Sequence, residues 1–240
     1  MPFASRLTDP RLIGELNAFA AANNFPDLYR AYAWRNDTYA NGFPDIYCLE
    51  SRLIRSDRTT GISVDDVKAL AAWGAMPNQG RIRGPATIAP RNTLHNAAGG
   101  PAATLAAHPL TPLTAIQAQL HGVGPTYQSK VLRFGLPQEY GAIDTRCGRV
   151  FGHGDAGAHR HDWINLRTRK SGYRWYISST QASWPDEYGM WIDILRYLAA
   201  TLPSNCTHPA AFTQAGLRHQ GRWECADVEM ALFSYASNYT

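Results

Sequence analysis

The residues best suited to chemistry lie between positions 120 and 152, where a glycine-rich turn is followed by a lysine and then by an aspartate. Asp144 carries a carboxylate that can stabilise developing positive charge or deprotonate a water molecule. The amine of Lys130 can act as a nucleophile or bind a polar group. Gly122 and Gly124 permit the positive φ and the close backbone approach that suit an anion-binding turn. These residue types favour a substrate that bears phosphate groups.

Two short helices must position this turn. The spacing predicts one helix over 111–120, which begins with Thr-Pro, and a second over 125–134, which begins with a proline. Val123 is expected to pack between them, while the free N–H groups at the start of the second helix point outward. Asp144 comes twenty positions after Gly124, as an N-cap of the segment TRCGRVF. An αα-corner with a plain N-cap would use the same residues.

The segment LHGVGPTYQSK, followed by AIDTRCGRV, resembles the helix-hairpin-helix DNA glycosylase superfamily. The resemblance covers about residues 113–151 and implies a mainly α, two-lobed fold with the aspartate at the mouth of the cleft. It implies that Asp144 is catalytic beside the deoxyribose of a base flipped out of double-stranded DNA. The residues that would grip the strand are Gly122, Val123, Gly124 and Thr126. Neither a metal nor another cofactor is expected.

The lysine pattern departs from this superfamily. Members that also cut the strand carry a lysine two residues beyond the second glycine, where this chain has Thr126. Lys130 lies four residues later on the same helix face. Three interpretations stay open for it: a displaced Schiff-base nucleophile with AP-lyase activity, a contact to a polar substituent on the base, or a solvated or phosphate-contacting side chain.

Other basic and aromatic residues are further candidates for DNA binding. The irregular stretch 77–100 holds Arg83 and Arg91, and it is either a surface loop or a basic loop that faces phosphates. Arg146 follows the aspartate. The stretch HGDAGAHRH at 153–161 fits no tight metal template and is expected to form a basic rim along DNA. Most large aromatic residues are expected in the core. The candidates for stacking in the base pocket are Trp34, Trp175 and Tyr127.

Hydrophobic periodicity predicts a mainly helical chain with a small β-hairpin in its C-terminal part. Helices are also expected over 11–22, 43–54, 63–76, 185–202, 208–217 and 222–238. The hairpin is expected over 164–178, with its turn at Lys170-Ser171-Gly172. We expect residues 1–240 to form a single unit. One lobe would be 25–144, with the helix-hairpin-helix at 112–134, and the other 1–24 plus 145–240.

Composition limits the class of protein. The 240 residues are 45% hydrophobic, enough to close a core, and the net charge of +4 favours polyanionic partners without naming one. Four widely spaced cysteines without a CxxC pair indicate reduced thiols rather than a disulfide framework or an iron–sulfur cluster. With no apolar leader and no run of membrane-spanning length, we expect a cytoplasmic monomer with no membrane partner.

The sequence therefore predicts a DNA N-glycosylase that releases a damaged or hypermodified base, in base-excision repair or in defence against phage. A non-enzymatic helix-hairpin-helix DNA-binding module is the first alternative, and it would make Asp144 dispensable. A helical protein-interaction domain is the second, and it would lack salt-sensitive affinity for DNA.

Overall fold

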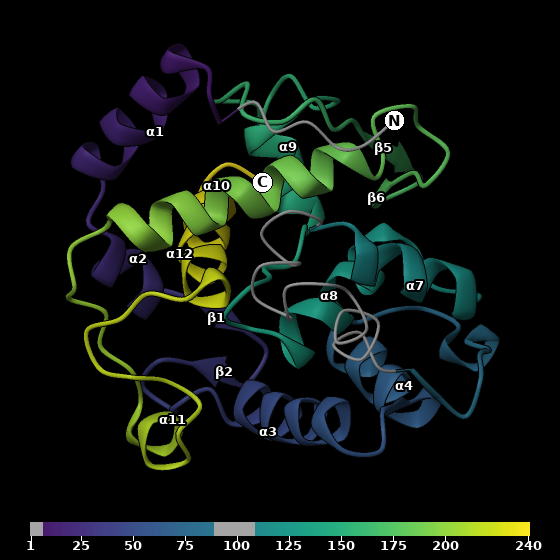
Figure 1. The fold of residues 1–240 in the computed structure, drawn as a ribbon. Helices are drawn as coiled ribbons and strands as arrows, with labels where there is room; N and C mark the ends of the chain where they lie inside the picture. The colour runs from purple at the N-terminus through teal and green to yellow at the C-terminus, as the bar shows by residue number, and fades with distance from the viewer. Residues whose placement is uncertain (1–6, 89–108) are drawn as a thin grey trace.

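The computed structural model describes residues 7–88 and 109–240, and these are mainly helical, as predicted (Figure 1). The longer helices are α1 (Pro10–Ala22), α3 (Pro44–Arg58), α4 (Val64–Trp73), α7 (Thr111–Gln119), α8 (Pro125–Gly135), α10 (Asp186–Thr201) and α12 (Cys225–Ser237). The short helices are α2 (Phe25–Arg30), the 3-10 turn η1 (Gln79–Arg81), α9 (Thr145–Phe151) and α11 (Ala210–Gln214).

Small antiparallel strand pairs join these helices. They are β1 (Ala33–Trp34) with β2 (Asp37–Thr38), β3 (Ile62–Ser63) with β4 (Thr87–Ile88), and β5 (Thr168–Ser171) with β6 (Arg174–Ile177). The β5-β6 pair is the predicted hairpin, but its turn is Gly172-Tyr173 rather than Lys170-Ser171-Gly172, because Lys170 pairs with Trp175 within the ladder. Gly172 has a φ of +58°, which suits glycine in a tight hairpin turn.

Local capping explains where several helices begin. The side chain of Asp9 accepts a hydrogen bond from the N–H of Arg11 and so caps α1. Ser63 and Asp66 form the reciprocal capping box at the start of α4 that their spacing predicts. Such contacts involve near neighbours in sequence, so their residue pattern alone predicts them.

Several helix bounds differ from the sequence prediction by a few residues, and side chains outside the helices contact the starts of two of them. Helix α3 continues to Arg58, and its start is held by Asp37, whose Oδ1 accepts from the N–H groups of Asp45 and Ile46. Helix α11 is shorter than the predicted 208–217 because the backbone N–H of His208 donates to the side chain of Gln220 and its ring contacts the Arg222 carbonyl.

The helices form two groups around one connected core of buried apolar side chains. Helices α3, α4 and α7 pack around α8, whereas α2, α9 and α10 pack against α12 (Figure 1). Helix α2 packs on α12, and its Tyr29 also contacts Tyr39 and Phe43. Lys130 on α8 and Asp144, the N-cap of α9, bring the two groups together through a contact of 3.5 Å.

Buried charges connect the two groups. Glu50 of α3 accepts from Arg133 of α8 and pairs with Arg218, whose Nη1 lies 2.9 Å from the second oxygen of Glu50. Arg218 also pairs with Asp227 of α12 at 2.9 Å and with Glu224 at 3.4 Å. Since all these side chains are almost completely buried, their mutual contacts are needed to offset desolvation.

Across residues 7–88 and 109–240, no helix combines the length and apolar character needed to cross a bilayer. All four cysteines fall inside these ranges and are unpaired.

Candidate active site

A pocket of about 680 Å³ lies where the turn before α8 meets the start of α9. The segment after α4 and the hairpin β5-β6 complete its wall. The lining residues that matter here are Trp34, Gly124, Thr126, Tyr127, Lys130, Asp144, Arg146, Arg149, Arg174 and Trp175. The fold thus brings most of the candidate residues predicted from sequence to one cavity.

Asp144 is the N-cap of α9 and also faces the pocket. Its Oδ1 accepts a hydrogen bond of 3.0 Å from the N–H of Arg146, as its position in the sequence predicts. Its other oxygen, Oδ2, lies 3.5 Å from Nζ of Lys130. The side chain retains 20% exposure, so water can reach it. The structural and chemical interpretations of Asp144 are compatible because they use different oxygen atoms.

Lys130 is buried, which contradicts its interpretation as a solvated side chain. Its ammonium lies 5.3 Å from the ring centroids of Trp73 and Tyr127 and 5.9 Å from that of Trp34. These distances are typical of cation–π contacts. The correction arises because α8 packs between α3, α4 and α7, which turns this face of the helix away from solvent.

The glycines of the turn serve different purposes. Gly122 has a φ of +79°, and a Cβ there would collide with the backbone carbonyl of Arg81, so the fold itself requires this glycine. Gly124 has an ordinary φ of −90°, and no described atom lies within 4 Å of where its Cβ would be. The open side of Gly124 therefore leaves its backbone accessible from the pocket.

Val123 is buried in the core, with only 8% exposure. Its side chain therefore cannot be a major contact to DNA, and its carbonyl is already bonded to the side-chain amide of Gln128. Thr126 follows Pro125 in the first turn of α8 and lies in the pocket wall. The accessible part of the predicted strand grip is thus Gly124 and Thr126.

A chain of hydrogen bonds fixes the aromatic wall around Lys130. Trp34 donates its indole N–H to the Trp73 carbonyl at 3.0 Å, and Trp73 donates its own to Oδ2 of buried Asp37 at 2.7 Å. Tyr127 donates its hydroxyl to the carbonyl of Gly74, and burial raises the pKa of Tyr127 to about 12. Tyr127 thus stays neutral at physiological pH and holds its ring against the lysine.

The far wall of the pocket combines the last predicted aromatic with arginines. The guanidinium of Arg149 lies 4.6 Å from the ring centroid of Trp175 and also pairs with Asp155 at 2.7 Å. Arg146 packs against Phe233 and Trp34, so it contributes to packing as well as to the charge of the pocket. Arg146 and Arg149 therefore place positive charge beside the half-buried rings of Trp34 and Trp175.

The arginines predicted in the irregular stretch lie elsewhere. The backbone of Arg83 pairs with His121 at the hairpin turn, and its side chain donates to the Gly80 carbonyl, outside this pocket. Arg91 lies outside the described residues. Trp163, Trp184 and Trp191 are core residues, which agrees with the expectation for most aromatics.

The sequence prediction missed Trp73, Arg149 and Glu229. Glu229, on α12, borders the inner end of the site together with Lys130 and Asp144. Burial raises its pKa to about 7, although the nearby cations of Arg133 and Lys130 oppose this shift. Helical periodicity predicted the helices that carry Trp73 and Glu229, but it holds no signal for a contact between α12 and α8.

The raised pKa of Glu229 predicts a pH-dependent stability. The folded chain keeps this proton up to about pH 7, whereas the ordinary value is 4.5, so this group lowers the free energy of unfolding as pH rises between those values. Glu229→Gln removes the titration. We therefore expect the variant to gain stability relative to the wild type between about pH 5 and pH 8. Calorimetric melting temperatures should shift by roughly 2–4 °C for each kcal/mol gained.

Comparing the two proteins at each pH cancels the titration of other groups, including Glu224, whose pKa burial also raises to about 7. If the melting temperatures of Glu229→Gln and the wild type differ by the same amount at about pH 5 and at about pH 8, the raised pKa of Glu229 is contradicted.

Comparison of the chain with protein-family models, with curated proteins and with solved structures found no match. Its function is therefore inferred from the residues and geometry of the pocket.

Proposed function

We propose that the chain is a DNA N-glycosylase that hydrolyses the bond between deoxyribose and a modified base held in the Asp144 pocket. One observation carries the proposal: Oδ2 of Asp144 lies 3.5 Å from Nζ of Lys130, in a pocket that the start of α8 also borders. A carboxylate, an amine and an accessible helix N-terminus are the groups that this chemistry uses.

The proposed reaction is a hydrolysis at C1′ of the flipped nucleotide. As the bond to the base breaks, its electron pair leaves with the base and positive charge develops on the sugar. The carboxylate of Asp144 stabilises this charge and takes a proton from the attacking water, whose hydroxyl bonds to C1′. Asp144 then passes this proton to the departing base, directly or through solvent, and so returns to its carboxylate form. The bond to the N–H of Arg146 holds the carboxylate in place during these steps.

The grip on DNA is assigned to the turn before α8 and to the arginines of the pocket. The N-terminus of α8 favours a phosphate through its dipole, and the open side of Gly124 permits close approach. Arg149 and Arg174 add charge across the pocket. We expect the affinity for DNA to fall steeply with salt concentration because these contacts release counterions.

The substrate is proposed to be a damaged or hypermodified base rather than an ordinary one. The pocket volume of about 680 Å³ is in the usual range for small-molecule sites, and aromatic rings offer stacking surfaces. Trp34 and Trp175 both line the wall, and Arg149 beside Trp175 suits a polar substituent. Repair and defence against phage differ in which modified base the pocket accepts.

The direct experiment incubates the protein with DNA pools that carry different modified bases and identifies the released bases by mass spectrometry. We expect one class of modified base to be released and ordinary bases to be retained. Salt-sensitive DNA binding without any release would favour the DNA-binding module, since the α8 turn can bind phosphate without chemistry. Absence of DNA affinity would contradict both.

The role of Lys130 is tested by borohydride trapping on DNA that contains an abasic site. Because its Nζ lies 3.5 Å from the carboxylate placed beside the sugar, we expect a covalent adduct in the wild type. Lys130→Ala should abolish it, while Lys68→Ala, at an exposed surface lysine, should leave it unchanged. Base release without an adduct would instead assign Lys130 to contact with a substituent on the base.

A further inference from the structure

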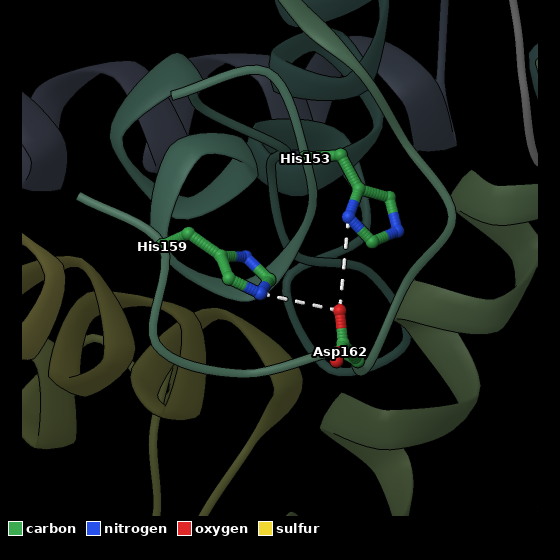
Figure 2. Close-up of side chains that lie close together, drawn as sticks. All are labelled: His153, His159 and Asp162. Carbon is green, nitrogen blue, oxygen red and sulfur yellow. Dashed lines mark ion pairs between the residues drawn. The ribbon is translucent and has the colours of Figure 1, made fainter. Parts of the chain in front are cut away.

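A separate cluster of potential metal ligands lies in the segment that follows α9. This segment folds back on itself, with the N–H of His153 donating to the Leu166 carbonyl at 2.9 Å and that of Thr168 donating to the His153 carbonyl at 2.8 Å. The closed loop brings His153 and His159 to the same side as Asp162 (Figure 2). These residues do not line the Asp144 pocket.

The three side chains converge on one point. Nε2 of His159 lies 3.2 Å from Oδ1 of Asp162, and Nδ1 of His153 lies 3.7 Å from the same oxygen (Figure 2). All three donor atoms lie within 4.8 Å of one another. Ligands bound tetrahedrally to zinc at about 2.1 Å lie about 3.4 Å apart, so small side-chain rotations place an ion among these atoms.

The hydrogen bonding of His159 determines which ring nitrogen faces the carboxylate as an acceptor. Its Nδ1 lies 2.6 Å from the carbonyl oxygen of Gly152, which can only accept, so Nδ1 carries a proton. In the neutral ring, Nε2 then directs a lone pair at Oδ1 of Asp162, only 3.2 Å away. Nε2 of His159 and Oδ1 of Asp162 then both direct lone pairs into the space between them, which is the arrangement of two ligands of one metal ion.

We propose that His153, His159 and Asp162 form a binding site for a divalent transition-metal ion, with Zn²⁺ as the preferred occupant. Two imidazoles and one carboxylate suit zinc, whereas magnesium and calcium prefer oxygen ligands. The bond from Nδ1 of His159 to the Gly152 carbonyl is the orienting contact that metal-binding histidines usually make. Asp162 is 59% exposed, so water or an external ligand can complete the coordination.

The proposed site departs from the expectation that the stretch 153–161 forms a basic rim and fits no tight metal template. The third ligand, Asp162, lies just beyond that stretch, and only the folded loop brings His153 back to it. Arg160 does not extend along a rim, because it donates to the carbonyls of Gly157 and His159. A bound ion would also stabilise the loop whose Asp155 pairs with Arg149 of the pocket.

Zinc binding is measured on the full chain without a polyhistidine tag, after a chelator has removed metals. Titration with Zn²⁺ against a chromophoric chelator should give one ion per chain. His159→Gln and Asp162→Asn should each weaken binding by at least about tenfold, since even orienting partners contribute that much. His121→Gln, at an exposed histidine outside the cluster, should bind zinc as the wild type does.

Co²⁺ provides an independent readout, because its visible absorption bands report the coordination geometry of the bound ion, and these bands should disappear in His159→Gln. The altered side chains are partly exposed, and melting curves verify that each variant folds. Asp144→Asn should retain zinc binding, so this proposal can fail or succeed independently of the glycosylase function.

Two outcomes would overturn the site. Zinc affinity that is unchanged in His159→Gln and Asp162→Asn would place the ion elsewhere, for example at the buried cluster Cys206, His208 and Asp227. Failure of the wild type to bind zinc would show that the contact between His159 and Asp162 forms without a metal ion.

Discussion

Asp144→Asn is expected to lower the rate of base release by at least about 10²–10³-fold, while the affinity for DNA is retained or increased. The substitution removes the negative charge that stabilises the sugar in the transition state. It keeps a side-chain oxygen that can accept from the N–H of Arg146, and asparagine caps helices about as well as aspartate. Helix α9 should therefore stay intact, and the effect should be on the chemical step.

The measurement is single-turnover release of the modified base identified by the pool experiment, combined with DNA affinity at several salt concentrations. Asp9→Asn is the matched control, because Asp9 caps α1 through the N–H of Arg11 in the same way and does not line the Asp144 pocket. Its rate should equal that of the wild type. An Asp144→Asn variant that releases base at the normal rate would refute the catalytic assignment and leave Asp144 as a helix cap alone.

Glu50→Gln is expected to lower the free energy of unfolding by about 3–5 kcal/mol, the range found when one partner of a buried ion pair is removed. Glu50 is completely buried and contacts both Arg133 and Arg218. Its neutral replacement leaves two buried guanidinium groups with too little negative charge around them. Because Arg133 lies on α8, the change also weakens the contact that holds the helix carrying Lys130.

Chemical denaturation followed by circular dichroism gives this free energy directly. Glu15→Gln is the control, since Glu15 forms an exposed pair with Arg11 and such pairs contribute little to stability. A loss in Glu50→Gln no larger than in this control would show that the buried arginines are satisfied by Asp227, Glu224 and Glu229 without it.

Predictions based on local sequence agree best with the structure. The Gly-Val-Gly turn, the N-cap at Asp144 and the capping box at Ser63 each depend on atoms only a few residues apart. Helix bounds agree less well than these local contacts, and several differ by a few residues. Asp37 holds the start of α3 from outside the helix, and Gln220 holds His208 just before α11.

The parts of the candidate site that the sequence analysis missed or misassigned are those with long-range contacts. The sequence left three interpretations of Lys130 open, because a lysine at one helix position does not reveal which element covers its side chain. Trp73 and Glu229 lie on correctly predicted helices, yet their place beside Lys130 depends on how α4 and α12 pack on α8. The contact of His159 with Asp162 likewise required the loop to close.

The sequence by itself determined a mainly helical chain with a glycine turn leading into α8 and an aspartate capping α9. Backbone sterics, helix capping and hydrophobic periodicity act over a few residues, and they can therefore be predicted from the sequence alone. Only the tertiary structure decided that Asp144 and Lys130 face each other in one pocket, that Glu50 joins two arginines, and that His153 reaches Asp162. These contacts arise because burial of the shared core brings distant segments together, and their distances depend on the packing of whole helices.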